Sequence, residues 1–163
     1  MVRDEDWAAA RAVGAGQVEH GLATGEASLS AELLQEIIDA ARAGLPNEAC
    51  GLLVSDRYHA DGGVPLRYVP LRNAAESPYR YLIDADEQLR VWMALDDADD
   101  VVWAIVHSHV ASPAKPSATD IGLAFYPDSL YVICSLAGPD SPAVRAWSIR
   151  DATVNEIHLA VTR

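Results

Sequence analysis

The stretch VVWAIVHSHVASPAKPSATD, residues 101–120, decides the fold because it joins three kinds of segment in one run. Residues 101–106 are apolar without interruption, as in a central strand covered on both faces, and we expect a strand over 101–107. Pro113 and Pro116 shape the loop that follows. Ser117 can then cap a short helix that extends to about residue 126. The stretch predicts a buried strand that leads through a loop into a helix.

Further strands are expected on both sides of this stretch. The runs 130–136, 144–149 and 154–161 are rich in apolar and β-branched residues, as strands are. Before the central strand, residues 49–55 and 66–71 are separated by a loop with paired glycines. They predict a hairpin with an enlarged loop.

Two longer helices are expected before the central strand. Ser30 caps the first, whose apolar residues recur at 3.6-residue spacing, and Gly44 is expected to end it in the left-handed conformation. Asp84 and Glu87 form a capping box for the second, which extends to about residue 95. Its candidate core positions are Leu89, Trp92, Met93 and Leu95. This order of elements predicts an α/β or α+β fold, in which helices pack against a single mixed β-sheet.

The chain of 163 residues has the length of one domain, which we place at residues 28–163. Residues 1–27 are expected to form an N-terminal extension, with a short helix over 4–13 and a linker that continues to about residue 28. Trp7 is the one large apolar residue near the start of this extension. It could dock on a neighbouring molecule, so a homodimer is among the expectations.

The net charge of −12 argues against a nucleic-acid partner, which requires a basic surface, and against an anionic membrane surface. No apolar run approaches the roughly 20 residues of a membrane span, and the acidic N-terminus does not resemble a signal peptide. The cytoplasm is therefore the expected location. Cys50 and Cys134 lie far apart in apolar stretches, where buried free thiols are expected. A reactive Cys50 is the less favoured alternative.

The polar residues of the central stretch have two interpretations. In the first, Ser117 and Asp120 are only a helix capping box. In the second, His107 and His109 project from one face of the strand, roughly 6.5 to 7 Å apart along it, and the helix returns Asp120 to the same point. Two imidazoles and a carboxylate form a catalytic zinc set that leaves a fourth position for water. On these residues alone, both interpretations stay open.

Glu48 is the candidate for a proton shuttle at such a site. It lies between Pro46, which prevents the first helix from continuing, and the apolar strand. A carboxylate beside an activated water can take its proton and pass it to the leaving amine. The alternative is an exposed acid in a turn.

Glu48, the His107-x-His109 pair and the Ser117-x-x-Asp120 pair together resemble the signature of the JAMM (MPN-plus) zinc metallopeptidases. The segments PNEACGLL, LRNAAESPYRYLIDADEQL and HSHVASPAKPSATDIGLAFYPDSLYVICSL are similar to those of the compact bacterial branch, and the resemblance extends over about residues 29–150. It implies an MPN-type fold related to the cytidine-deaminase architecture.

The resemblance implies Zn²⁺ as cofactor, with His107, His109 and Asp120 as its ligands. It makes Glu48 the general acid/base and Ser117 the residue that stabilises the tetrahedral intermediate. Val110 departs from the family pattern, since many members have proline directly after the second histidine.

The implied function is a zinc-dependent peptidase or isopeptidase. Its expected substrate is a ubiquitin-like sulfur-carrier protein, cleaved after the C-terminal Gly-Gly, in some cases with release of cysteine. The alternative is a non-catalytic scaffold of the same fold, and such relatives typically lack the zinc ligands. A zinc deaminase is excluded, because it requires His-x-Glu and Pro-Cys-x-x-Cys motifs that this sequence does not contain.

Overall fold

The computed structural model describes residues 25–138 and 140–163. The expected helix over 4–13, Trp7 and most of the expected linker lie outside the described residues, so the homodimer stays a prediction. Within the described ranges, no helix has both the length and the apolar character needed to cross a membrane.

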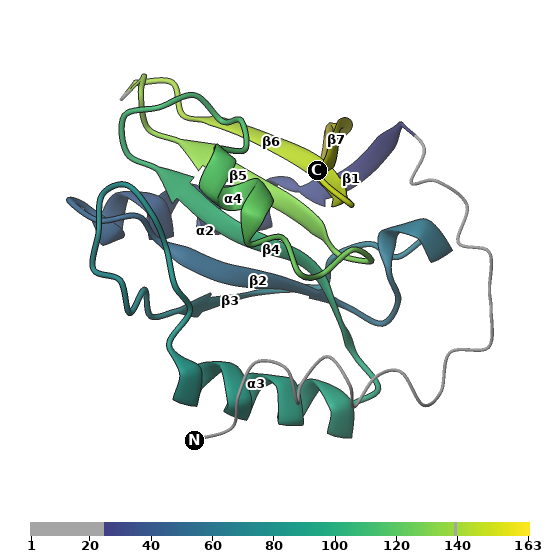
Figure 1. Cartoon of the computed structure of the whole chain (residues 1–163). Coiled ribbons are helices and arrows are strands. Elements are labelled where there is room, and N and C mark those ends of the chain that lie inside the picture. The colour runs from purple at the N-terminus through teal and green to yellow at the C-terminus, as the bar shows by residue number, and fades with distance from the viewer. Residues whose placement is uncertain (1–24, 139) are drawn as a thin grey trace.

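Seven strands form one mixed sheet in the order β1-β7-β6-β5-β4-β2-β3 (Figure 1). The strands are β1 (Glu26–Ser30), β2 (Cys50–Ser55), β3 (Arg67–Leu71), β4 (Val101–His109), β5 (Leu130–Ser135), β6 (Ala143–Arg150) and β7 (Thr153–Thr162). Pairing is parallel between β1 and β7 and between β4 and β5, and antiparallel between the other neighbours. The predicted fold class, a single mixed sheet packed by helices, is confirmed.

The central strand β4 lies between β2 and β5, as its continuous apolar sequence predicted. Trp103 and Ala104 are fully buried, and residues 102–109 are buried without a break. The strand continues two residues beyond the expected end, so His109 belongs to it. Because His107 and His109 are both strand residues two positions apart, their side chains share one face of the sheet.

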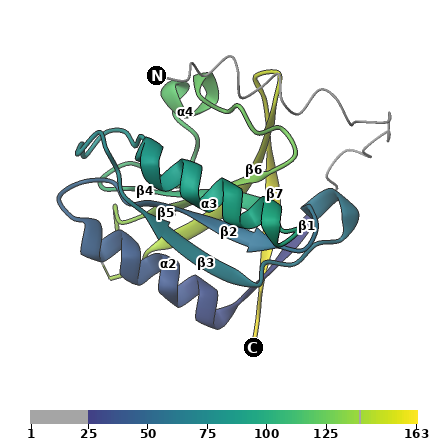
Figure 2. The ribbon, with the colours of Figure 1, turned by 90° about the horizontal axis from the view of Figure 1, so that it is seen from below.

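In the part of the chain that the structure describes, three α-helices and one short 3₁₀ helix accompany the sheet: α2 (Ala31–Gly44), α3 (Ala85–Asp97), α4 (Ala118–Gly122) and η1 (His59–Asp61). The core residues of α2 belong to one apolar cluster, and those of α3 belong to a second cluster. The two longer helices therefore cover opposite faces of the sheet, and Figure 2 shows β3 passing between them. Helix α4 begins at the expected residue but ends at Gly122 instead of extending to 126.

The expectation that Gly44 adopts the left-handed conformation is wrong. Gly44 is the last residue of α2, and the glycines with positive φ among the described residues are Gly25 and Gly62. A Cβ atom at position 44 would lie 3.0 Å from the Cβ of Ala49. The glycine is explained by this close approach of the helix end to the residue that precedes β2.

Helix α3 buries a narrower stripe than expected. Trp92 and Leu95 are each 5% exposed, whereas Leu89 and Met93 are 52% and 60% exposed. Val91 packs against the same cluster as Trp92 and Leu95, so the buried stripe lies on the side of the helix away from Leu89 and Met93. The capping box is also incomplete. Asp84 caps the helix, but the Glu87 carboxylate accepts from the backbone N–H of Arg72 at 2.6 Å.

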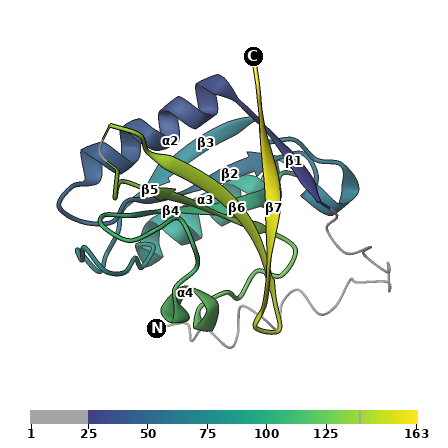
Figure 3. The same ribbon diagram turned by 90° about the horizontal axis from the view of Figure 1, so that it is seen from above.

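Strand β1 replaces the last part of the expected linker. Ala27 and Leu29 alternate with more exposed neighbours and are 3% and 0% exposed, so residues 26–28 are part of the sheet. The strand pairs with the second half of the long strand β7, which lies between β1 and β6 in Figure 3.

Candidate metal centre

The two histidines of β4 direct their imidazole rings to one point. The Nε2 atoms of His107 and His109 are 3.1 Å apart, and both side chains are almost fully buried. Two ring nitrogens at this distance form either one hydrogen bond or two corners of a coordination shell. Further donors at the same point distinguish these cases.

Asp120 brings a carboxylate to the same point from the first turn of α4. Its Oδ1 lies 3.3 Å from Nε2 of His107, and its Oδ2 lies 3.3 Å from Nε2 of His109. The capping box at Ser117 orients this carboxylate. The Asp120 backbone N–H donates to Ser117 Oγ at 3.1 Å, and the Ser117 backbone N–H donates to Asp120 Oδ2 at 2.7 Å.

The spacing of the three groups fits a tetrahedral ion. Nitrogen and oxygen ligands bind Zn²⁺ at about 2.0 to 2.1 Å, which places tetrahedral ligands about 3.3 Å from one another. The Nε2 atoms of His107 and His109 are 3.1 Å apart, and each lies 3.3 Å from a different oxygen of Asp120, while one ligand atom from each of the three residues can be chosen so that all lie within 4.8 Å of one another. Two imidazoles and one carboxylate also form a known catalytic zinc set. The residues present therefore fit this metal.

The pKa shifts of His107 and Asp120 favour metal binding, whereas that of His109 favours a proton that an ion would have to displace. Burial lowers the pKa of His107, which favours the neutral ring that a metal requires. Burial also lowers the pKa of His109, but contacts with Asp120 and Pro113 outweigh it and leave the pKa raised. Burial raises the pKa of Asp120, but the contacts with the two histidines outweigh it and hold the pKa well below its ordinary value. The aspartate is therefore an anion over the whole neutral range.

Glu48 lies on the same face as the two histidines. The antiparallel pairing of Cys50 with His107 continues through a hydrogen bond from Ser108 N to Ala49 O at 2.9 Å, which brings Glu48 opposite His109. Glu48 is 5% exposed, and burial raises the pKa of its carboxyl to about 7. The alternative interpretation, in which Glu48 is an exposed acid in a turn, is inconsistent with this burial.

Two buried side-chain atoms in the described part of the chain have no hydrogen-bond partner: Glu48 Oε2 and His107 Nδ1. Buried polar atoms are nearly always paired in native proteins, so an orphaned carboxylate oxygen beside three candidate metal ligands indicates a missing partner. A water molecule at the ion would be such a partner for Glu48.

Ser117 combines an exposed side chain with a fixed orientation. Its oxygen accepts from Asp120 N, which leaves the hydroxyl hydrogen available for another acceptor. The residue therefore has one free donor next to the triad. The capping interpretation is confirmed at this position and is compatible with the functional one, which stays a prediction.

The sequence reasoning gave no role to two residues of the segment that follows β3. Asn73 Nδ2 donates to Glu48 O at 2.9 Å, and its Oδ1 accepts from the backbone N–H of Ala75 and Leu82, each at 3.0 Å. Tyr81 stacks on the His107 ring with centroids 4.4 Å apart and planes at 24°. Both residues lie in the segment LRNAAESPYRY, but nothing in its pattern indicates these long-range contacts.

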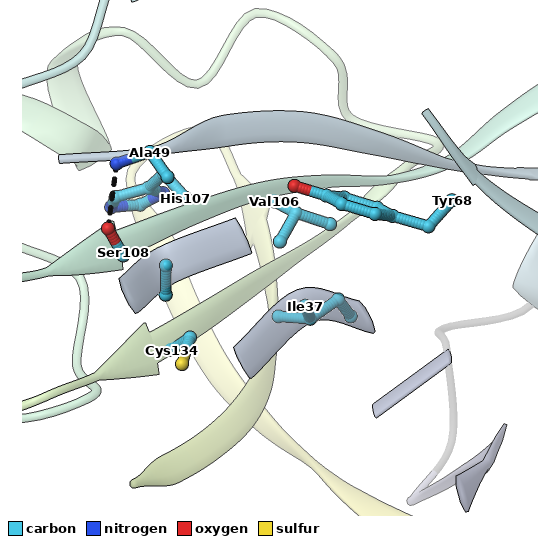
Figure 4. A pocket seen from close by; sticks show the side chains of 8 residues that line it. Ile37, Ala49, Tyr68, Val106, His107, Ser108 and Cys134 are labelled. Atoms are coloured by element: carbon cyan, nitrogen blue, oxygen red, sulfur yellow. Dashed lines mark hydrogen bonds between the residues drawn. The ribbon is translucent and has the colours of Figure 1, made fainter. Parts of the chain in front are cut away.

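The opposite face of β4 carries structural contacts (Figure 4). The Ser108 hydroxyl accepts from the Ala49 backbone N–H at 2.8 Å, next to a narrow gap between α2 and the sheet that Val106, Tyr68 and Cys134 help to line.

Both cysteines are buried free thiols, as expected. Burial raises the pKa of Cys50 to about 12, which excludes a reactive thiolate at neutral pH.

Comparison with known proteins gives one family match and several close relatives. A family model for prokaryotic homologs of the JAB domain (Prok-JAB) matches residues 30–150. The CysO-cysteine peptidase of Mycobacterium tuberculosis is 42% identical over 132 residues, which cover 78% of this chain and 86% of the relative. The desampylase of Haloferax volcanii is 34% identical over 116 residues, covering 68% of this chain and 81% of the relative.

Solved structures share the fold. A protein of Desulfitobacterium hafniense is 37% identical, with a TM-score of 0.73 over 83% of this chain and 92% of that one. A JAB1/MPN domain protein from Archaeoglobus fulgidus is 18% identical, with a TM-score of 0.54 over 85% of this chain and 99% of that one. At this identity, the second likeness concerns the fold alone.

Proposed function

Since the chain belongs to the family of prokaryotic homologs of the JAB domain, and is accordingly a hydrolase of the JAMM peptidase type, we propose that it is zinc-dependent. We propose further that it hydrolyses the amide bond after the C-terminal Gly-Gly of a ubiquitin-like sulfur-carrier protein. The convergence of His107, His109 and Asp120 beside the buried carboxyl of Glu48 supports this proposal most directly.

In this proposal, His107, His109 and Asp120 hold the ion. A zinc ion there would supply Lewis-acid polarisation of a water molecule and of the scissile carbonyl. The three residues are buried, so the surrounding dielectric is low and electrostatic effects on a bound substrate are strong.

Glu48 has the role of general base and then general acid. Its carboxylate takes a proton from the attacking water and returns that proton to the nitrogen of the leaving group, so that an amine departs. Without an ion, burial raises the pKa of this carboxyl to about 7. A zinc ion nearby would lower that pKa and favour the carboxylate that acts as the base. The unpaired Oε2 is the atom we assign to the proton transfer.

Ser117 has the role of hydrogen-bond donor to the carbonyl oxygen that becomes negatively charged. Its oxygen is already fixed by the helix cap, so the hydroxyl is preorganised and only its hydrogen turns toward the substrate. Donors of this kind contribute roughly 10²- to 10³-fold to kcat.

The relatives guide the choice of substrate. The mycobacterial relative is named as a peptidase for CysO-cysteine, and for this chain we propose release of cysteine from a carrier tail. The name of the Haloferax relative favours a second candidate, cleavage of an isopeptide bond between a ubiquitin-like protein and a target. The same site residues would serve both reactions. The scaffold alternative is disfavoured because the full set of donor atoms is present.

Mass spectrometry tests the proposal. Zinc-loaded wild type and a Glu48→Gln variant are each incubated with a small ubiquitin-like carrier extended by one cysteine after Gly-Gly, and with the same carrier joined to a lysine side chain. Metal content is measured in parallel on both proteins. Loss of the single cysteine by wild type only is the expected result.

The alternative outcomes separate the candidates. Cleavage of the lysine-linked carrier only would favour the isopeptidase. A protein with one zinc per chain that cleaves neither carrier would contradict the substrate proposal. A protein without stoichiometric zinc would favour the scaffold, and full activity of Glu48→Gln would remove Glu48 from the mechanism.

A further inference from the structure

The loop over residues 110–116, between β4 and α4, is held by side chains from two neighbouring strands. Ser135, at the end of β5, donates from Oγ to the carbonyl of Ser112 at 2.6 Å. Trp147, in β6, donates from Nε1 to the carbonyl of Ala114 at 3.1 Å. These two carbonyls flank that of Pro113, so the anchors hold the peptide units on both sides of it.

The Pro113 carbonyl is the acceptor that a candidate metal ligand uses. His109 Nδ1 lies 2.7 Å from it. When Nδ1 donates to a carbonyl, Nε2 keeps its lone pair, and Nε2 is the atom that lies 3.3 Å from Asp120 Oδ2. Hydrogen bonds of this type fix the tautomer and the orientation of a metal-binding histidine.

The anchor between Trp147 and Ala114 is shielded from water on both sides, whereas Ser135 is a buried donor to an exposed residue, Ser112. Ser135 is 4% exposed, Trp147 is 6% exposed, and Ala114 is 3% exposed. A buried carbonyl that loses its donor cannot obtain a replacement from solvent without a rearrangement of the loop. The Ala114 carbonyl is the buried one, and its peptide unit adjoins that of Pro113, so a change at Trp147 reaches His109 through two neighbouring peptide units.

We propose that Trp147 and Ser135 are positioning residues of the metal centre, which hold the Pro113 carbonyl where it orients the His109 ring. The inference rests on the proposed metal site. In this arrangement the 110–116 loop is a fixed wall of the site. The sequence gives no sign of the role, because Trp147 is 38 positions beyond His109 and its alternating pattern indicates only a strand.

The test compares two tryptophans that make the same kind of bond. Trp147→Phe removes the indole N–H from the Ala114 carbonyl. Trp103→Phe is the matched control. Trp103 Nε1 also makes a buried hydrogen bond, to the Gly63 carbonyl at 2.8 Å, in a loop that contributes no residue to the triad. Zinc affinity is measured by competition with a chromophoric chelator, and the Co²⁺-loaded proteins are compared by their visible absorption spectra. Thermal unfolding of the metal-free proteins reports the structural cost of each change.

We expect Trp147→Phe to lower zinc affinity about tenfold, the smaller end of the effect of outer-shell changes, and to alter the Co²⁺ spectrum. Trp103→Phe should leave the zinc affinity and the Co²⁺ spectrum unchanged, although each tryptophan substitution lowers the melting temperature. Ser135→Ala is a second, smaller variant, which should change affinity in the same direction as Trp147→Phe.

Unchanged affinity in folded Trp147→Phe and Ser135→Ala would overturn the inference and leave both residues as core residues. An equal loss of affinity in Trp103→Phe would also overturn it, because the effect would then follow general destabilisation. A wild type that binds no zinc would contradict the proposed function itself. Metal binding in a wild type that cleaves no carrier would contradict the substrate but not this inference.

Discussion

Glu48→Gln is expected to stabilise the metal-free protein at high pH while it removes activity. The Glu48 carboxyl is 5% exposed, and its pKa is raised from 4.5 to about 7, chiefly by burial. A carboxyl whose pKa is raised on folding favours the folded state at low pH, where it is protonated in both states. That contribution is lost as the pH rises from the unfolded pKa through the folded one.

The magnitude follows from the two pKa values. With 4.5 in the unfolded chain and about 7 in the folded chain, the wild type loses about 2.5 kcal/mol of unfolding free energy between pH 5 and pH 8 from this group alone. Glutamine does not ionise, so the variant does not lose this contribution. Titrating groups that do not interact with Glu48 cancel in the difference. His109 does not cancel fully, because the Glu48 charge contributes to its raised pKa.

The assay is urea unfolding of both proteins in a chelating buffer at several pH values between 5 and 8. The diagnostic quantity is the change with pH in the difference between their unfolding free energies, because a constant packing effect of the amide does not contribute to it. Glu36→Gln, an exposed change on α2, is the control for the loss of a carboxyl group as such. A difference between wild type and Glu48→Gln that is independent of pH would refute the reasoning.

Three other substitutions test the surroundings of the site. Gly51→Ala places a Cβ 2.6 Å from a backbone oxygen of β3 and should lower the free energy of unfolding by about 1 to 3 kcal/mol. Gly122→Ala, which adds a Cβ in open space, should leave the melting temperature unchanged or raise it, and equal melting temperatures of the two variants would contradict the clash. Ser117→Ala should lower kcat roughly 10²- to 10³-fold and should lower the melting temperature slightly, and Ser117→Thr should restore both. A wild-type kcat in the alanine variant would exclude the donor role. Asn73→Asp keeps the acceptor oxygen but loses the hydrogen bond to the Glu48 carbonyl, so kcat should fall about tenfold with little change in KM. A change in KM alone would assign Asn73 to substrate binding.

The sequence predicted the sheet and the candidate ligands because both depend on short-range patterns. The apolar run of β4 required burial on both faces, and it is the strand between β2 and β5. Two residues that lie two positions apart in a strand have their side chains on the same face, so the spacing of His107 and His109 predicted a shared face without knowledge of the remaining fold. The location of Asp120 followed from its place in the first turn of α4.

Features that depend on distant contacts were not predictable. Helical periodicity treats Leu89 and Trp92 alike, and only the line of contact between α3 and the sheet decides that Trp92 is buried. Strand β1 is too short, and its alanine too small, to stand out from a glycine-rich surrounding. Its place is decided by pairing with β7 at the far end of the chain. The role of Asn73 likewise requires knowledge that Glu48 and Leu82 meet around it.

The capping box at Ser117 shows why the two sequence interpretations of this stretch are not alternatives. A carboxylate has about four lone-pair positions, so Asp120 can accept from the Ser117 backbone N–H and still direct lone pairs at an ion. The cap fixes the carboxylate in the first turn of α4, and without it the side chain would lose rotamer entropy on binding the metal. A helix of only five residues has little stability of its own, so an ion held by Asp120 and the two histidines would in turn fix α4 to β4. The cap therefore preorganises the ligand, and the metal would stabilise the helix that presents it.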